Sequence, residues 1–171
     1  GLEDIEAHWL FDASYDQIVP IIHPQSIVHS LVEYQDGAVI AQLGAPDMRL
    51  PIQYALSYPD RWPVHFETLD LVSCGPLTFF EPDREVFRAL PLAIEAGRAG
   101  GIMPTVFNAA NEVADDAFIK GQIPFLAMAD LIEAVLGKVE PVSQLSYETI
   151  VEADRKAREV ARVLLTSMGE A

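Results

Sequence analysis

The chain has 171 residues, half of them hydrophobic, which is enough to bury a core and excludes disorder over most of the length. Its 26 acidic and 11 basic residues give a net charge of −15, so the average surface repels nucleic acid and anionic membranes, and neither is expected as a partner. Cys74 is the only cysteine, which excludes an internal disulfide and predicts a reducing, cytoplasmic setting, and no apolar stretch is long enough for a membrane span.

The first quarter of the sequence predicts a short helix followed by β-structure. Residues 2–11 place apolar side chains on one helical face. Residues 17–23 form an apolar run that ends at a proline and is typical of a buried strand. Residues 26–34 and 38–43 are two β-rich runs joined at Asp36-Gly37, and a two-residue Asp-Gly connection predicts a hairpin.

Pairing Gln35 with Ala38 assigns the hairpin side chains to two faces. The apolar face is expected to pack on helices and comprises Val28, Ser30, Val32, Tyr34, Val39, Ala41 and Leu43. The mixed face suits a site or a subunit contact and comprises Ile27, His29, Leu31, Glu33, Ile40 and Gln42. In this register His29 lies opposite Gly44, at the start of the loop 44–48. A one-residue slip would reverse the faces.

The remainder of the chain predicts a linker and a helical bundle. Residues 51–57 read as a short helix with proline at its first position, and the proline-rich segment 58–83 reads as a linker with one strand at 66–72. Proline starts and glycine stops, the last at Gly169, delimit four further helices. They span residues 91–99, 104–120, 124–136 and 146–168. The predicted fold class is therefore α+β, a small sheet with flanking helices followed by a four-helix bundle.

Two carboxylates near the chain start are candidate metal ligands. Glu3 and Glu6 lie three residues apart at the beginning of a predicted helix, so they share one side of it. Oxygen ligands suit a hard divalent cation, but acidic residues in a first turn also complement the helix dipole. From the residues alone the dipole role is favoured.

The loop and hairpin carry the other candidate residues. A neutral His29 can hydrogen-bond a substrate or exchange a proton, and it can equally be a buried histidine at a subunit contact. His23 is expected to fix the end of its strand. Met48 can cover a flat ring or fill a gap in a core, and Arg49 can bind an anion or pair with Asp47.

Three stretches form motifs, of which the first two are long enough to be specific: His23-Pro-Gln-Ser-Ile-Val-His-Ser30, Gln42-Leu-Gly-Ala-Pro-Asp-Met-Arg-Leu-Pro-Ile-Gln53 and Asn108-Ala-Ala-Asn-Glu-Val-Ala114. They resemble the deoxyxylulose-phosphate reductoisomerase family, and the similarity runs over essentially the whole chain. In addition, Gly1-Leu-Glu-Asp-Ile-Glu-Ala7 resembles the end of that family's Asn-Lys-Gly-Leu-Glu motif. The resemblance implies that residues 1–57 end a catalytic and dimerisation domain, 58–83 form a linker and 84–171 form the bundle.

The resemblance also implies an activity and a role for individual residues. The family isomerises 1-deoxy-D-xylulose 5-phosphate and reduces it with NADPH to 2-C-methyl-D-erythritol 4-phosphate, using Mg²⁺ or Mn²⁺. Glu3 matches a metal ligand that also touches the substrate, and Glu6 matches no ligand. Pro46 and Met48 match the loop against the nicotinamide, with Met48 also near the substrate, and His29 matches a supporting histidine. The sheet at 17–43 matches the homodimer surface.

Several parts of the family's site have no counterpart in this sequence. The other two acidic ligands, the phosphate-binding residues and the nucleotide-binding fold are absent from the 171 residues. We therefore expect the isolated chain to be inactive, because one carboxylate does not hold Mg²⁺ usefully. Two alternatives are a non-catalytic acidic dimerisation or binding module that retains the fold, and a small metal hydrolase using His23, His29 and Glu3.

Overall fold

The computed structural model describes residues 1–168, which fold into two compact units. One unit combines the segment Gly1–Pro20 with the chain from Pro82 onward, and the other is Ile21–Glu81. Gly169, the predicted stop of the last helix, lies outside the described residues. The predicted division at residues 57 and 83 into family domains stays a prediction.

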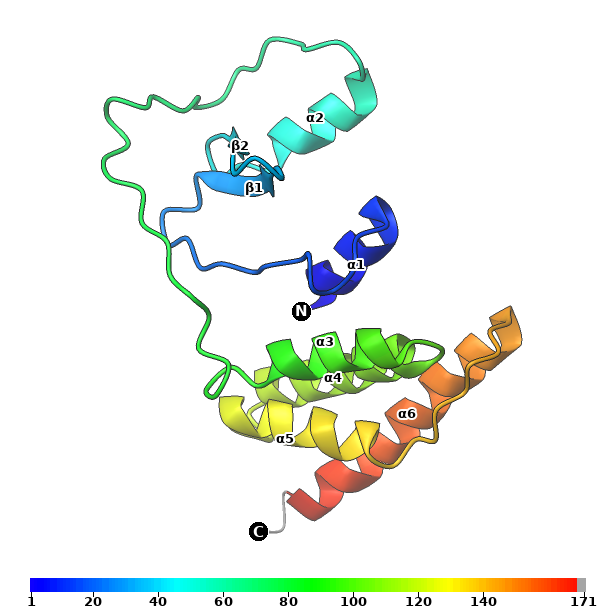
Figure 1. The fold of residues 1–171 in the computed structure, drawn as a ribbon. Helices are drawn as coiled ribbons and strands as arrows, with labels where there is room; N and C mark the ends of the chain where they lie inside the picture. The colour runs from blue at the N-terminus through cyan, green and yellow to red at the C-terminus, as the bar shows by residue number, and fades with distance from the viewer. Residues whose placement is uncertain (169–171) are drawn as a thin grey trace. The chain divides into compact units, whose positions relative to one another are not determined.

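The first unit begins with helix α1 (Leu2–Phe11), which has the predicted bounds. Its bundle comprises α3 (Ala89–Ala99), α4 (Met103–Ile119), α5 (Phe125–Leu136) and α6 (Tyr147–Met168), and α1 contacts α3 (Figure 1). The α+β fold class and the four-helix bundle are thus confirmed.

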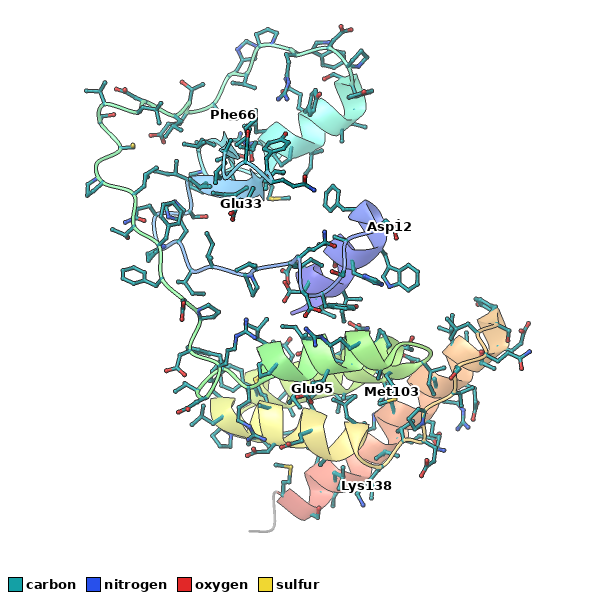
Figure 2. The ribbon with its side chains drawn as sticks, in the orientation of Figure 1. Asp12, Glu33, Phe66, Glu95, Met103 and Lys138 are labelled. Atoms are coloured by element: carbon teal, nitrogen blue, oxygen red, sulfur yellow. The ribbon has the colours of Figure 1, made fainter. Side chains whose placement is uncertain are left out.

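Helix α4 lies at the centre of the bundle and contacts α3, α5 and α6. It contributes Val106, Phe107 and Ala110 to a core that also contains Leu131 and Val135 of α5. Figure 2 shows side chains of the four helices filling the space between them. The bundle is therefore held mainly by burial of apolar surface.

The last helix buries a stripe of small residues. Ala153, Ala157 and Ala161 are buried at four-residue spacing, which lets α6 approach α4 closely. Its start is capped reciprocally: the Ser146 amide donates to Thr149 Oγ1 at 2.7 Å, and the Thr149 amide donates to Ser146 Oγ at 3.2 Å.

The second unit contains a hairpin of β1 (Val28–Glu33) and β2 (Val39–Leu43), followed by α2 (Arg49–Ser57). The predicted strand at 17–23 is wrong, because within this run only Ile22 pairs, in a single bridge with Phe80. The predicted strand at 66–72 is also wrong, since residue 66 is in a bend, residues 67–70 have no regular structure and a turn begins at residue 71.

The predicted hairpin register is wrong by one residue. Leu31 pairs with Ala41 and Glu33 with Val39, so the two predicted faces of β1 are exchanged relative to β2. The connection has three residues rather than two: the Tyr34 amide donates to Ala38 O at 2.8 Å. A two-residue type I′ turn needs positive φ at both central positions, but of Asp36 and Gly37 only Gly37 has it, at 82°.

Candidate functional site

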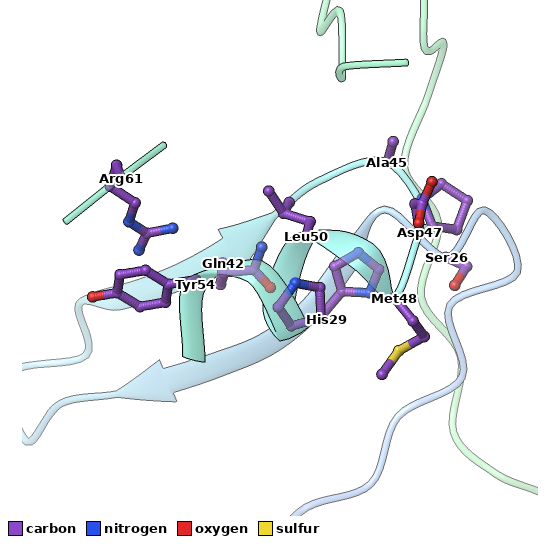
Figure 3. Close-up of a pocket in the computed structure, with 11 residues that line it drawn as sticks. Ser26, His29, Gln42, Ala45, Asp47, Met48, Leu50, Tyr54 and Arg61 are labelled. Carbon is purple, nitrogen blue, oxygen red and sulfur yellow. The ribbon is translucent and has the colours of Figure 1, made fainter. Parts of the chain in front are cut away.

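A pocket of about 510 Å³ lies within the second unit, between the hairpin, the loop 44–48 and α2 (Figure 3). Its lining contains three of the residues predicted for the site, His29, Pro46 and Met48. The other lining residues are Ser26, Gln42, Ala45, Asp47, Leu50, Pro51, Tyr54 and Arg61. The lining is largely apolar with a few polar groups, as expected of a small-molecule site.

His29 reaches the pocket because it is the extra residue of a β-bulge. The pairing shifts between Val28, opposite Leu43, and Ser30, opposite Gln42, which leaves His29 without a partner in β2. Its Nε2 lies 3.2 Å from Gly44 O. A carbonyl only accepts, so Nε2 carries the hydrogen in this contact. This contact fixes the start of the loop 44–48.

The far end of the loop is fixed by Asp47 and Arg49. The Arg49 amide and its Nε each donate to Asp47 Oδ1 at 2.9 Å. These hydrogen bonds, chiefly those from the Arg49 side chain, hold the pKa of Asp47 below its usual value. The Arg49 guanidinium also lies 4.6 Å from the centre of the Phe66 ring. Of the two predicted roles for Arg49, pairing with Asp47 is therefore the one observed.

The contacts at both ends of the loop 44–48 hold the backbone of Met48, but its side chain is largely exposed. It precedes the first residue of α2, and 71% of its surface is exposed. Figure 3 shows its thioether among the side chains that line the pocket. A flexible, polarizable side chain in this position can cover the face of a flat ring. Met48 therefore does not fill a gap in the core of this unit.

Two lining residues had no signal in the sequence. Arg61 lies over the Tyr54 ring at 3.5 Å from its centre, and this pair forms the opposite end of the pocket from Met48. The Gln53 side chain donates to Trp62 O at 3.0 Å, which holds the first linker residues against α2. A proline-rich segment has no periodicity, so the sequence could not place Arg61.

His23 lies outside this pocket and fastens the linker. Its Nδ1 is 2.8 Å from Thr78 O, and its ring stacks on Phe79 with 4.6 Å between centres. Within either unit, residues 1–168 bring no three His, Cys, Asp or Glu side chains together as a metal site. The set of His23, His29 and Glu3 that a metal hydrolase would need draws on both units and stays a prediction.

Glu3 lies in the first unit, in the first turn of α1, with its side chain 86% exposed. A hydrogen bond from its own backbone amide is the largest influence on the pKa of Glu3 and lowers it. The carboxylate is thus ionised and accessible, which suits a ligand for a hard cation. A shared pocket of Glu3 and the loop 44–48 stays a prediction.

The fold and the pocket define a helical-bundle domain combined with part of a small-molecule site. The family described as the DXP reductoisomerase C-terminal domain matches residues 43–160. The chain belongs to this family, as its motifs predict.

Curated relatives carry the name 1-deoxy-D-xylulose 5-phosphate reductoisomerase. The protein of Pelotomaculum thermopropionicum is 59% identical over 158 residues, which cover 92% of this chain and 41% of the relative. That of Phocaeicola vulgatus is 53% identical over 167 residues, 98% of this chain and 44% of the relative. The chain thus spans about two fifths of the length of these relatives.

Solved structures agree with these matches. A reductoisomerase of Zymomonas mobilis in complex with NADPH is 42% identical with a TM-score of 0.90, covering 95% of this chain and 43% of that one. A DOX-P reductoisomerase with NADPH, fosmidomycin and magnesium is 39% identical with a TM-score of 0.89, covering 97% and 43%. Within residues 1–168, no helix combines the length and apolarity needed to cross a bilayer.

Proposed function

We propose that this chain is the C-terminal part of an NADPH-dependent 1-deoxy-D-xylulose 5-phosphate reductoisomerase of isoprenoid precursor synthesis. The observation that carries the proposal is the pocket of the second unit, which gathers His29, Pro46 and Met48 in a chain more than half identical to curated reductoisomerases. The relatives solved with NADPH and magnesium support the same cofactors here.

Each candidate residue has a task that fits its surroundings. Glu3 would be one ligand of Mg²⁺ or Mn²⁺ and would touch the substrate, since its carboxylate is ionised and exposed. Pro46 and Met48 would pack against the nicotinamide, and Met48 also against the substrate. His29 would support them by holding the carbonyl of Gly44. The bound cation supplies Lewis-acid polarisation of substrate oxygens, and NADPH supplies the hydride.

The decisive experiment uses a reconstituted enzyme, in which residues 1–171 replace the matching segment of the Pelotomaculum thermopropionicum relative. We expect NADPH oxidation that depends on 1-deoxy-D-xylulose 5-phosphate and on Mg²⁺. Glu3→Gln removes a charged ligand and should lower kcat/KM by roughly 10- to 100-fold. Glu6→Gln, an exposed carboxylate on the same helix, is the matched control and should stay within about twofold.

Two results would count against this function. An inactive reconstituted enzyme would mean that these residues do not complete the site. Equal activities of the Glu3 and Glu6 variants would show that Glu3 is not a metal ligand. The isolated chain should not oxidise NADPH in the presence of substrate, because it offers only one carboxylate ligand for the cation. Sustained turnover by the isolated chain would refute the proposal that the other metal ligands come from the rest of the enzyme.

We also propose that the enzyme is a homodimer through the segment 17–43, which contains the hairpin of β1 and β2. The hairpin supports this because apolar side chains such as Leu31, Val32 and Ile40 are between 43 and 62% exposed. Leu31→Glu in the reconstituted enzyme should shift the sedimentation coefficient toward the monomer. Val72→Glu, at an apolar linker residue that is 94% exposed, is the control, and unchanged sedimentation of the Leu31 variant would exclude this surface.

A further inference from the structure

Helix α1 and the turn after it are anchored to the bundle along α3, within the first unit. Ile5 and Asp4 are buried, and Leu2 packs against the bundle core. The other face of the first turn is free, since Glu3 is 86% exposed at its side chain. The position of the Glu3 backbone is therefore set by its buried neighbours rather than by contacts of its own.

The anchor is tight enough to require two residues without a side chain. A Cβ at Gly1 would lie 2.6 Å from the Cβ of Ala93, and a Cβ at Gly97 would lie 2.2 Å from the hydroxyl oxygen of Tyr15. The ring carbons Cζ and Cε1 of Tyr15 would be 2.4 and 2.8 Å away. Real Cβ contacts are not this short, so Tyr15 lies on α3 only because Gly97 leaves room for its ring.

Tyr15 in turn is tied to α1. Its ring stacks on His8 with 4.6 Å between ring centres, and His8 Nδ1 lies 2.7 Å from Ala13 O. Its neighbour Asp16 accepts a hydrogen bond from Arg98 at 2.5 Å. A displacement of Tyr15 from α3 therefore moves the turn and α1 with it.

We infer that Gly97 and Tyr15 are positioning residues for the proposed metal ligand: the contact of Tyr15 with α3, together with the burial of the neighbours of Glu3, holds this residue at the cation. This inference rests on the proposed function. Replacing a group that orients a metal ligand typically costs about 10- to 100-fold in metal affinity or activity, so the fit at Gly97 acts on the cation proposed at Glu3. Neither Gly97 nor Tyr15 touches the metal.

The test measures the Mg²⁺ concentration that gives half-maximal activity of the reconstituted enzyme. Gly97→Ala places a methyl group against Tyr15 and should raise that concentration about 10-fold or more, while kcat at saturating Mg²⁺ falls much less. A purely structural lesion lowers the active fraction and leaves the half-saturating concentration unchanged. The control is Gly137→Ala in the same bundle, where the new Cβ meets only ordinary contacts at 3.5 Å or more.

A second variant keeps the test decisive if Gly97→Ala does not fold. Tyr15→Ala leaves α3 intact but removes the anchor, and it should raise the half-saturating Mg²⁺ concentration by a similar factor. Because the two residues act through one contact, the double variant should behave like Tyr15→Ala alone.

Each outcome bears on one of the two proposals. If Glu3→Gln weakens the Mg²⁺ dependence but active Gly97 and Tyr15 variants do not, the positioning role is overturned and the metal role of Glu3 stands. If the effects of the Gly97 and Tyr15 substitutions multiply in the double variant, they do not act through their mutual contact. If Glu3→Gln itself leaves the Mg²⁺ dependence unchanged, the proposed function fails first.

Discussion

Replacement of Gly101 by alanine should destabilise the bundle far more than the same replacement at Gly121. Both glycines follow bundle helices and have positive φ angles, 55° and 70°. An alanine in this region costs roughly 1–2 kcal/mol at either position. The surroundings differ, because a Cβ at Gly121 meets nothing within 4 Å, whereas a Cβ at Gly101 would lie 2.2 Å from Val142 O.

The additional cost at Gly101 follows from a hydrogen bond. Moving Val142 O from 2.2 Å to the 3.4 Å of an ordinary contact requires a shift of about 1 Å between the two segments. The amide of Ile102 donates to the same oxygen at 3.1 Å, and Ile102 is 4% exposed. The shift would break this bond and leave a buried amide without a partner, which costs about 1–3 kcal/mol. We therefore expect a loss of roughly 2–5 kcal/mol for Gly101→Ala and about 1–2 kcal/mol for Gly121→Ala.

Urea unfolding followed by circular dichroism at the helix band measures both values, since most of the helical residues belong to the bundle. The difference between the variants isolates the collision, because the backbone strain is common to both. Equal losses of unfolding free energy in the two variants would refute the close packing of Gly101 against the connection between α5 and α6.

Two further predictions concern the core and the surface of the bundle. Leu131 is fully buried, so Leu131→Ala should lower the free energy of unfolding by about 2–5 kcal/mol, while Leu145→Ala, at 49% exposure, should lose well under half of that in the same urea titration. The Glu112 carboxylate accepts hydrogen bonds from Arg158 at 2.7 Å and Asn108 at 3.1 Å, which lower its pKa from the ordinary 4.5. Its stabilisation is therefore complete above the unfolded pKa and is lost as the pH falls through the folded value, so Glu112→Gln should be less stable than the wild type at pH 7 and nearly equal to it in strong acid.

The helices were predictable because their signals are local. Proline and glycine punctuation gave every bundle helix to within two residues of its observed bounds. Proline is compatible with any position in a first turn, so Pro91 marks the beginning of α3 without fixing its first residue, which is Ala89. At α6 the start was marked by Ser146, which lies one residue before the helix, and its capping partner Thr149 lies in the first turn.

The β-structure was less predictable because pairing depends on distant residues. The apolar run 17–23 suggests a surface that must be covered, but not whether its partner strands lie within these 171 residues. In the hairpin, the Asp36 side chain accepts a hydrogen bond from the Ala38 amide at 3.0 Å, which favours a longer turn than the two-residue type. The three-residue turn shifts the register by one residue from the predicted pairing and exchanges the faces of β1 relative to β2.

The candidate site contains residues that local sequence signals could locate and residues that only long-range contacts bring together. The loop 44–48 could be located from its residues, and the bulge at His29 turns the predicted proximity of His29 to Gly44 into a contact of 3.2 Å despite the altered register. Tyr54 and Arg61 could not be found, because a contact between a helix and an aperiodic linker leaves no pattern in either.

The second unit obtains its order from polar contacts near the pocket rather than from a core of its own. A two-stranded hairpin is marginal by itself, and this one exposes Leu31 and Val39 on one face and Val32 and Ile40 on the other. What fixes the loop 44–48 is the bond from His29 to Gly44 at one end and the pair of Asp47 and Arg49 at the other. Both ends are therefore preorganised without help from the hairpin faces, which leaves those faces available to other protein surface. This division explains how a loop with an exposed Met48 can be held in one geometry on a sheet that buries so little of its own apolar surface.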